Sequence, residues 1–256
     1  MKKLRVLVAG AKGRMGQEVI QMVTKDDELE YVGGVDLQAS EESTPPIYQS
    51  VEKAIIDLKP DILVDFTIPQ SVRNNMEIAI QMGVSPVVGT TGLTQQDIHE
   101  LDKLAKEYKI GGLIAPNFSI GAILMMKFSA VAAKYMPHVE IIEMHHDKKL
   151  DAPSGTAIKT AELIEKERKA IMQGHPEEKE IIAGARGSEY SGFRIHSVRL
   201  PGYVAHQEVI FSDVGQTLTV RHDSMNRESF MPGVNLAIKK VKSFEGIVYG
   251  LEHFIE

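Results

Sequence analysis

The apolar residues in the first 116 positions follow two alternating patterns. Short, mostly apolar runs, of which residues 62–66 are the clearest, are typical of strands that are buried on both faces of a parallel sheet. Between these runs, apolar residues share one helical face, as Met15, Val19 and Val23 do, and this spacing predicts amphipathic helices. The predicted strands are 4–9, 31–35, 62–66, 86–88 and 110–115, and the predicted helices are 14–24, 51–58 (N-cap Ser50), 71–82 and 95–108 (N-cap Thr94). This order predicts an α/β fold, a Rossmann-like doubly wound parallel sheet.

The pattern changes near Asn117. A long apolar helix is expected at 120–136, followed by a strand at 139–144, a helix at 157–172, and alternating strands at 193–198, 207–211 and 217–220. We therefore predict a second α+β domain, residues 117–226, with a mixed or antiparallel sheet. A last helix, 227–241, returns the chain to the first domain, which comprises residues 1–116 plus 227–256. Segments 38–49 and 184–192 are expected to be the least ordered, and the second is a candidate lid.

Composition narrows the class of protein. The 256 residues are 43% hydrophobic and 25% charged, as in an ordinary soluble globular protein. No apolar run is long enough to cross a bilayer, and the first ten residues read as a strand that leads into a glycine loop rather than as a signal peptide. The absence of cysteine excludes disulfides and a thiol nucleophile and favours a cytoplasmic location. The net charge of −6 gives no reason to expect nucleic-acid binding.

A glycine-rich loop follows the first predicted strand. Residues 10–16 read GAKGRMG, a variant of the dinucleotide-binding fingerprint, and the glycines allow a pyrophosphate to approach the start of a helix. Asp36 ends the second strand, where an acidic residue would hold the adenosine ribose hydroxyls, and this favours NAD. Lys12 and Arg14 can instead pair with the 2′-phosphate of NADP, whereas the residue after Asp36 is Leu37 rather than arginine. The preference between NADH and NADPH therefore stays open.

Two later loops point to the same edge of the sheet. Gly89-Thr90-Thr91-Gly92 and Ala115-Pro116-Asn117-Phe118 both follow parallel strands, at the carboxyl ends where doubly wound sheets bind ligands. Each loop alone is no more than an ordinary turn. As a set, they are better explained by the nicotinamide end of a dinucleotide.

The run EMHHDKKLDAPSGTA, residues 143–157, is the most informative segment. His145, His146 and Lys149 gather positive charge directly before Pro153, which is expected early in a helix. The N–H groups of Gly155 and Thr156 at this helix start would bind a carboxylate or phosphate. A histidine is also the side chain most easily poised for proton transfer near neutral pH.

A metal site is a second interpretation of this segment. Adjacent strand residues point to opposite faces, so His145 and His146 rarely ligate one ion; Glu143 and His145 can share a face, but a catalytic zinc needs a third ligand. We therefore expect no metal, and assign no role to Lys148. The residues favour hydride transfer to or from a small carboxylic acid. The alternatives are another two-domain dehydrogenase, acting on an amino acid or polyol, and a dinucleotide-sensing regulator, for which the sequence has no basic recognition helix.

The chain resembles the 4-hydroxy-tetrahydrodipicolinate reductase (dihydrodipicolinate reductase) family of lysine and diaminopimelate biosynthesis. The resemblance rests on residues 10–16, 89–92, 115–119 and 143–157 and spans most of the chain. It implies an oxidoreductase that uses NADH and/or NADPH to deliver hydride to C4 of a cyclic dicarboxylate, after the 4-hydroxyl leaves as water. It also implies a homotetramer joined through the second domains. The expectation of a cytoplasmic protein, with neither nucleic acid nor membrane as a partner, comes from the composition.

The resemblance also assigns residue roles. It implies that His145 is the acid/base residue, that Lys149 is the proton donor, and that His146, Gly155 and Thr156 bind substrate. The implied cofactor contacts are Gly10, Ala11, Lys12, Gly13, Arg14, Met15, Asp36, Gly89, Thr90, Thr91, Ala115, Pro116, Asn117 and Phe118.

Overall fold

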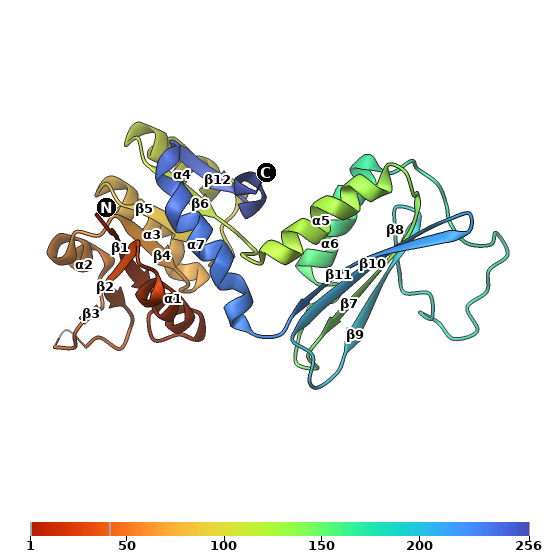
Figure 1. Cartoon of the computed structure of the whole chain (residues 1–256), viewed down its shortest axis with the longest axis horizontal. Coiled ribbons are helices and arrows are strands. Elements are labelled where there is room, and N and C mark those ends of the chain that lie inside the picture. Colours follow the sequence, from red (N-terminus) through yellow and green to blue (C-terminus); the bar gives the residue numbers. More distant parts are fainter. Residues whose placement is uncertain (1, 41, 256) are drawn as a thin grey trace. The chain divides into compact units, whose positions relative to one another are not determined.

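The computed structural model describes residues 2–40 and 42–255, which form two compact units (Figure 1). The first unit contains the described residues up to Ser119 and from Phe230 onward; the second contains Ile120–Ser229. The chain thus leaves the first unit after Ser119 rather than Pro116, and re-enters it at Phe230 rather than Arg227. No helix in the described part of the chain is long and apolar enough to span a membrane.

The first unit is built on a seven-stranded parallel sheet of order β12-β6-β5-β4-β1-β2-β3. Helices cover the sheet, and the predicted doubly wound fold is confirmed (Figure 1). The strands are β1 (Leu4–Ala9), β2 (Leu29–Val35), β3 (Ile47–Tyr48), β4 (Ile62–Asp65), β5 (Ser85–Val88), β6 (Gly111–Ile114) and β12 (Gly246–Tyr249). The helices are α1 (Arg14–Lys25), α2 (Val51–Leu58), α3 (Pro69–Gln81), α4 (Gln95–Glu107) and α7 (Met231–Lys240), with short 3-10 turns η2 (Val241–Ser243) and η3 (Leu251–Phe254). A further 3-10 turn, η1 (Arg227–Phe230), crosses the boundary where the chain returns from the second unit.

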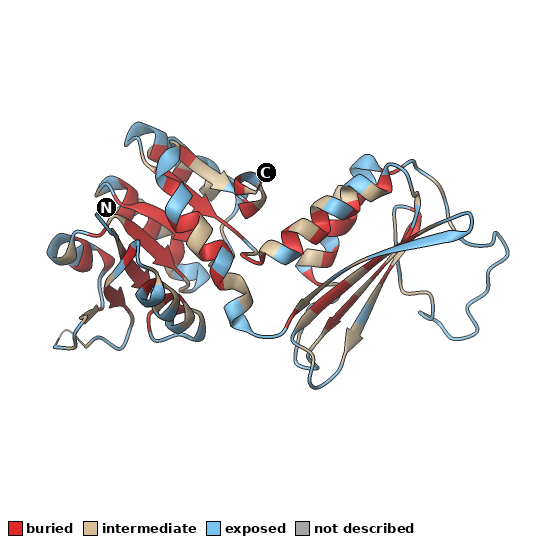
Figure 2. Cartoon of the chain, in the orientation of Figure 1, coloured by how far each residue is buried: buried red, intermediate tan, exposed pale blue. Residues whose placement is uncertain are grey.

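The apolar runs become the buried centre of this sheet. Every residue of β4 is buried, and Figure 2 shows the central strands as buried ribbon. Leu7 and Ala9 of β1 pack with residues of α2 in one apolar cluster, whereas Val88 and Ile114 pack with residues of α3 and α4 in another. Burial of such side chains is the main favourable contribution to folding. The packing of these apolar clusters fixes the positions of the strands and of their carboxyl ends.

The helix starts follow local capping chemistry. The Ser50 hydroxyl accepts a hydrogen bond from the Lys53 amide, and Thr94 forms a capping box with Asp97. Each cap satisfies backbone donors that have no partner within the helix. The predicted N-caps Ser50 and Thr94 are therefore confirmed.

The last helix is attached to the first one. Asn235 and Lys239 of α7 both contact the carboxylate of Asp26, the C-cap of α1, at 2.7 and 2.9 Å. Burial alone would raise the pKa of Asp26, but the hydrogen bonds from Asn235 and Lys239 lower that pKa to about 2. The return of the chain to the first unit therefore rests on charged and polar contacts as well as on apolar packing.

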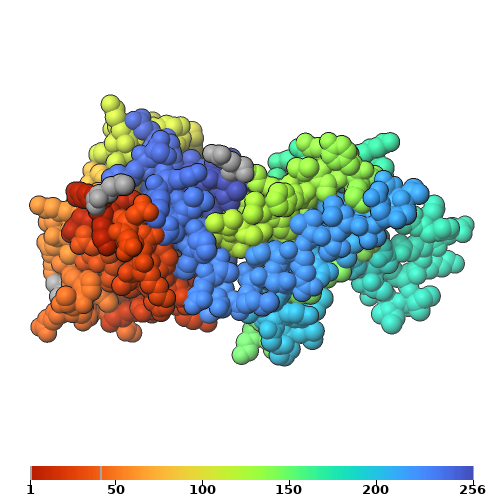
Figure 3. All heavy atoms as spheres, in the orientation of Figure 1, coloured from red at the N-terminus to blue at the C-terminus, as the bar shows by residue number. Residues whose placement is uncertain are grey.

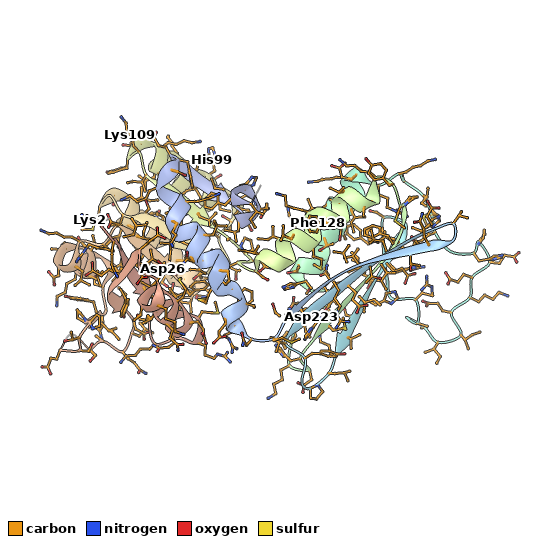
Figure 4. The ribbon with its side chains drawn as sticks, in the orientation of Figure 1. Lys2, Asp26, His99, Lys109, Phe128 and Asp223 are labelled. Carbon is orange, nitrogen blue, oxygen red and sulfur yellow. The ribbon has the colours of Figure 1, made fainter. Side chains whose placement is uncertain are left out.

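The second unit has a mixed five-stranded sheet of order β11-β10-β7-β9-β8. The pairs β7–β10, β10–β11 and β8–β9 are antiparallel, whereas β7–β9 is parallel, so the predicted mixed sheet is confirmed. Helix α5 lies on the surface of this unit and exposes Phe128 (Figures 3 and 4), and Tyr135 in the turn after the helix is also exposed. The elements are α5 (Ile120–Ala133), β7 (His138–His145), α6 (Gly155–Glu167), β8 (Ser188–Tyr190), β9 (Phe193–Arg199), β10 (Ala205–Asp213) and β11 (Gln216–Ser224).

Short strands account for most of the missed elements. Strand β3 lies within segment 38–49, where Ser40 and Ile47 also exchange backbone hydrogen bonds, and Glu41 of that segment lies outside the described residues. Strand β8 likewise occupies residues of the candidate lid, and β12 was not predicted. Two- to four-residue strands carry too little alternation to be recognised from sequence.

Three predicted helices were too long. Helix α6 ends at Glu167 rather than at residue 172, because the Arg168 guanidinium donates to the carbonyls of Pro137, Ser191 and Ile171 and the backbone becomes extended there. Helix α5 ends at Ala133 rather than at 136, and the predicted helix 227–241 is divided into η1 and α7.

Candidate active site

The glycine loop of the first unit requires glycine at two positions. Gly10 has a φ of 77°, and a Cβ there would lie 2.6 Å from the Phe66 carbonyl oxygen. A Cβ on Gly16 would overlap the carbonyl of Gly10. The loop can therefore pack this closely only without side chains, and the helix α1 begins directly after it, with Gly13 as N-cap. The backbone matches what a pyrophosphate-binding turn needs.

Asp36 holds the same loop from the end of β2. Its carboxylate accepts hydrogen bonds from the amides of Lys12, at 2.9 Å, and Gln38, at 3.2 Å. A carboxylate has about four acceptor sites, so it retains capacity for further donors. The side chains of Lys12 and Arg14 are exposed, whereas Ala11 is buried and contributes backbone only. The structure thus brings the predicted adenosine-binding residues together.

A buried aspartate, Asp65, organises the next two loops. It ends β4 and is fully buried, and its carboxyl group accepts hydrogen bonds from Thr67 (backbone 2.8 Å and hydroxyl 2.6 Å), Asn75 (2.8 Å) and Thr90 (3.0 Å). Thr90 belongs to the predicted loop 89–92, so Asp65 fixes that loop against β4. Sequence reasoning missed this residue. The sequence feature that could have identified Asp65 is a carboxylate at the end of an otherwise apolar strand, because a buried polar group needs hydrogen-bond partners.

The loop at 115–118 lies beside the loop at 89–92. The Ala115 amide donates to the carbonyl of Val88 at 2.9 Å, one residue before Gly89. Phe118 is buried, with its ring 5.7 Å from that of Phe66. Pro116 and Thr91 are exposed at this edge. The three predicted cofactor loops therefore share the carboxyl edge of one parallel sheet.

The candidate site of the second unit is built around a buried carboxylate. Glu143 and His145 are two residues apart on β7 and share a face, and the Nδ1 atom of His145 lies 2.5 Å from Oε2 of Glu143. The Glu143 side chain is 0% exposed and that of His145 is 14% exposed. Burial alone would raise the pKa of Glu143, but hydrogen bonds from His145 and Arg199 lower that pKa to about 2.

Arg199 balances the charge of Glu143. Its two terminal nitrogens donate to both carboxylate oxygens, at 2.8 and 2.7 Å, in the bidentate geometry that favours arginine. Arg199 comes from β9, where it pairs in register with His145. It also donates to the backbone carbonyl of Asp151 at 2.8 Å. No signal in the sequence linked Arg199 to residues 56 positions earlier.

The start of α6 is attached to the same carboxylate. The Ser154 amide donates to Oε1 of Glu143 at 3.2 Å, and the Ser154 hydroxyl caps the helix by accepting from the Ala157 amide. Gly155 and Thr156 are the first two helical residues, as an anion-binding helix start requires. The helix begins two residues earlier than predicted, and Pro153 precedes the N-cap rather than lying within the helix.

The remaining predicted residues lie in the loop between β7 and α6. The Lys149 ammonium group contacts Asp151 at 2.6 Å, and the Lys149 amide donates to the carbonyl of His146. The hydrogen bond from the Lys149 side chain holds the pKa of Asp151 below its usual range. His146 and Lys148 are exposed. The structure thus joins His145 to the helix start through Glu143, and joins Lys149 to this carboxylate through Asp151 and Arg199.

Metal ligation has no counterpart among the residues that the structure describes. Within residues 2–40 and 42–255, no group of three or more His, Asp or Glu side chains is arranged to hold a metal ion. Glu143 and His145 do share a face, as a metal site would need. Their partner is Arg199 rather than a third ligand.

Comparison with known proteins matches both parts of the chain to one family. The model for the N-terminus of dihydrodipicolinate reductase matches residues 4–118, and the model for its C-terminus matches residues 121–255. The 4-hydroxy-tetrahydrodipicolinate reductase of Halalkalibacterium halodurans is 56% identical over 99% of this chain and 100% of its own. That of Streptococcus thermophilus is 55% identical over 98% of this chain and 99% of its own.

A solved structure agrees with these sequence matches. The dipicolinate-bound dihydrodipicolinate reductase of Paenisporosarcina sp. TG-14 has a TM-score of 0.90 and 46% identity, covering 98% of this chain and 99% of its own. A probable dehydrogenase from Thermotoga maritima has a TM-score of 0.67 at 14% identity, a likeness that concerns the fold alone.

Proposed function

Because the chain belongs to the dihydrodipicolinate reductase family, it is an NAD(P)H-dependent oxidoreductase, and we propose that it reduces 4-hydroxy-tetrahydrodipicolinate to tetrahydrodipicolinate in lysine and diaminopimelate biosynthesis. The observation that carries this function is the match of both halves of the chain to one family, together with curated relatives more than half identical over their full length. The substrate loses its 4-hydroxyl as water and accepts hydride at C4.

The first unit is the proposed dinucleotide-binding domain. Gly10 and Gly16 allow the backbone to turn tightly where a Cβ would collide with backbone carbonyls, and a tight glycine turn before the start of α1 supports a pyrophosphate site there. Asp36 is placed to accept from ribose hydroxyls, and the loops at 89–92 and 115–118 line the same edge. When bound, the reduced nicotinamide supplies the hydride. The exposed Lys12 and Arg14 support use of NADPH as well as NADH.

The second unit is the proposed substrate-binding domain. The relative from Paenisporosarcina binds dipicolinate, a small dicarboxylate, and we infer the same ligand class for this chain. Gly155 and Thr156 at the start of α6 offer backbone donors and the positive end of a helix dipole to one carboxylate. His146, exposed in the preceding loop, is the proposed side-chain contact.

Proton transfer is assigned to His145 and Lys149. His145 is the acid/base residue, because its ring is held by Glu143 and remains partly accessible. Lys149 is the proton donor: its ammonium group, which contacts Asp151 at 2.6 Å, can donate to a developing anion. In this proposal the enzyme is a cytoplasmic homotetramer assembled through the sheets of the second units. Light scattering coupled to gel filtration measures that oligomeric state.

A coupled assay tests the proposed function. Pyruvate, aspartate semialdehyde and a purified 4-hydroxy-tetrahydrodipicolinate synthase generate the substrate, and absorbance at the nicotinamide band follows NADH or NADPH oxidation. We expect oxidation that depends on both synthase precursors and is inhibited by dipicolinate. Oxidation of neither cofactor in the complete mixture would reject the proposed function.

A further inference from the structure

One buried carboxylate connects the parts of the second-unit site. Glu143 contacts His145 on its own strand, Arg199 on β9, and the backbone of Ser154 at the start of α6. We propose that Glu143 is a positioning residue, which fixes the ring of His145 and the first turn of α6 in a single arrangement. This inference rests on the proposed function, in which His145 transfers the proton and α6 binds a substrate carboxylate.

The contact with Glu143 determines which nitrogen of His145 carries a proton. Glu143 forms a bidentate ion pair with Arg199, and an ionised carboxylate can only accept hydrogen bonds. Nδ1 of His145 must therefore be the donor in the 2.5 Å contact. The neutral ring then carries its proton on Nδ1, which leaves Nε2 as the nitrogen that exchanges a proton with substrate.

The other oxygen of Glu143 binds the start of α6, which is the proposed binding site for a substrate carboxylate. Oε1 accepts from the Ser154 amide at 3.2 Å, and Ser154 is the N-cap of α6. Rotation or loss of this carboxylate would shift the start of α6, and with it the backbone N–H groups of Gly155 and Thr156. The two proposed functions, proton transfer and carboxylate binding, therefore share one support.

Arg199 makes the burial of Glu143 possible and connects Glu143 to the loop that carries Lys149. A buried charge without a partner is strongly unfavourable, and the bidentate pair supplies that partner. Through its bond to the Asp151 carbonyl, Arg199 also holds the residue that contacts Lys149. The network thus runs from His145 to Lys149 through Glu143, Arg199 and Asp151.

The same strand supplies a matched control. Glu140 also pairs with an arginine, Arg186, at 2.6 Å, and with a histidine, His196, at 2.8 Å. It lies three positions from Glu143 on β7 and therefore on the opposite face of the sheet. Replacing Glu140 removes a cluster of the same composition without touching His145 or α6.

The kinetic test compares Glu143→Gln with Glu140→Gln in the coupled assay. Glutamine keeps the volume, but its amide has one acceptor oxygen and places a donor against the donors of Arg199 or His145. We expect kcat for Glu143→Gln to fall at least about tenfold, as for loss of general acid–base catalysis, and KM for substrate to rise. NADH affinity, measured by fluorescence titration, should stay within about twofold, because the first unit is untouched. Glu140→Gln should retain kcat.

A folded Glu143→Gln variant with normal kcat and normal KM for substrate would overturn the proposal. So would an equal loss of kcat in Glu140→Gln, because the effect would then be that of any lost ion-pair cluster. Circular dichroism establishes whether each variant is folded.

A spectroscopic measurement on the wild-type chain needs no variant of Glu143. Histidine-selective ¹⁵N labelling and long-range proton–nitrogen correlation report the tautomer of each neutral ring, and the His145 signal is identified by its loss in His145→Gln. We expect the Nδ1–H tautomer; the Nε2–H tautomer would overturn the proposal. Since this readout requires no substrate, it is independent of the outcome of the activity assay. Activity in the wild type with the wrong tautomer would reject only the role of Glu143.

Discussion

The backbone amide of Lys12 donates to the carboxylate of Asp36 across 2.9 Å, so one acidic side chain holds the glycine loop from the neighbouring strand. The residue expected to select the cofactor thus also holds the loop that is proposed to bind the cofactor's phosphates. The side chain of Lys12 is exposed beside this contact. In the proposed function, cofactor preference depends on these two opposite charges.

Replacing Asp36 with alanine should weaken binding of NADH more than that of NADPH. The change removes an acceptor for the ribose hydroxyls and also removes a negative charge that repels a 2′-phosphate. We expect KM for NADH to rise by roughly tenfold, the equivalent of about 1.4 kcal/mol, with a smaller rise for NADPH. Steady-state kinetics with each cofactor measure the two values. Asp27→Ala, at an exposed position after α1, is the control and should change neither.

Replacing Asp65 with asparagine should impair both stability and cofactor binding. Thr67, Asn75 and Thr90 all donate to this buried carboxyl group, and an asparagine would turn an NH₂ group toward at least one of them. We expect the free energy of unfolding to fall by about 1–3 kcal/mol, with KM rising for NADH and NADPH alike. Urea titration and kinetics measure these effects. Asp57→Asn, exposed on α2, should leave both unchanged; a stable Asp65→Asn variant would contradict the interpretation of this cluster.

Much of the first unit could be predicted because its determinants are local. Residues 62–64 are an apolar run, Ser50 and Thr94 cap the helices they precede, and the glycine loop follows its strand directly. Once strands and helices alternate, the parallel sheet and its carboxyl edge follow from topology. The proximity of the loops at 89–92 and 115–118 could therefore be predicted without any knowledge of the side-chain contacts.

The contacts of the second-unit site could not be predicted, because they depend on strand pairing. Glu143 meets Arg199 only because β7 and β9 run parallel in a register that places His145 opposite Arg199. A shift of one residue would turn Arg199 to the other face. The end of α6 has a similar origin, since Arg168 leaves the helix to bind carbonyls far away in the sequence. Sequence supplied the chemical groups of the site, and tertiary pairing supplied their partners.

Acid should destabilise the wild-type protein more than it destabilises the Glu143→Gln variant. The pKa of Glu143 falls from an ordinary value of 4.5 to about 2 in the folded chain, so its ionised form favours folding. That contribution is fully present above about pH 4.5 and is lost as the pH falls toward 2. We expect urea midpoints of the wild type to decline more steeply across this range. Parallel slopes for the two proteins would contradict the depressed pKa of Glu143.

Lys149 and Lys148 give the sharpest comparison of neighbouring side chains. Lys149 contacts Asp151, which joins it to Arg199 and the buried carboxylate, whereas Lys148 is exposed. In the proposed mechanism, Lys149→Ala removes the proton donor, and kcat should fall by roughly 100-fold or more, a typical contribution of general acid catalysis. Lys148→Ala changes the net charge equally, so any loss of long-range attraction for a dianionic substrate should appear in both variants. The role of Lys149 therefore requires that kcat falls in Lys149→Ala alone, with NADH affinity unchanged in each. Equal kinetics in the two variants would reduce Lys149 to a contributor of surface charge.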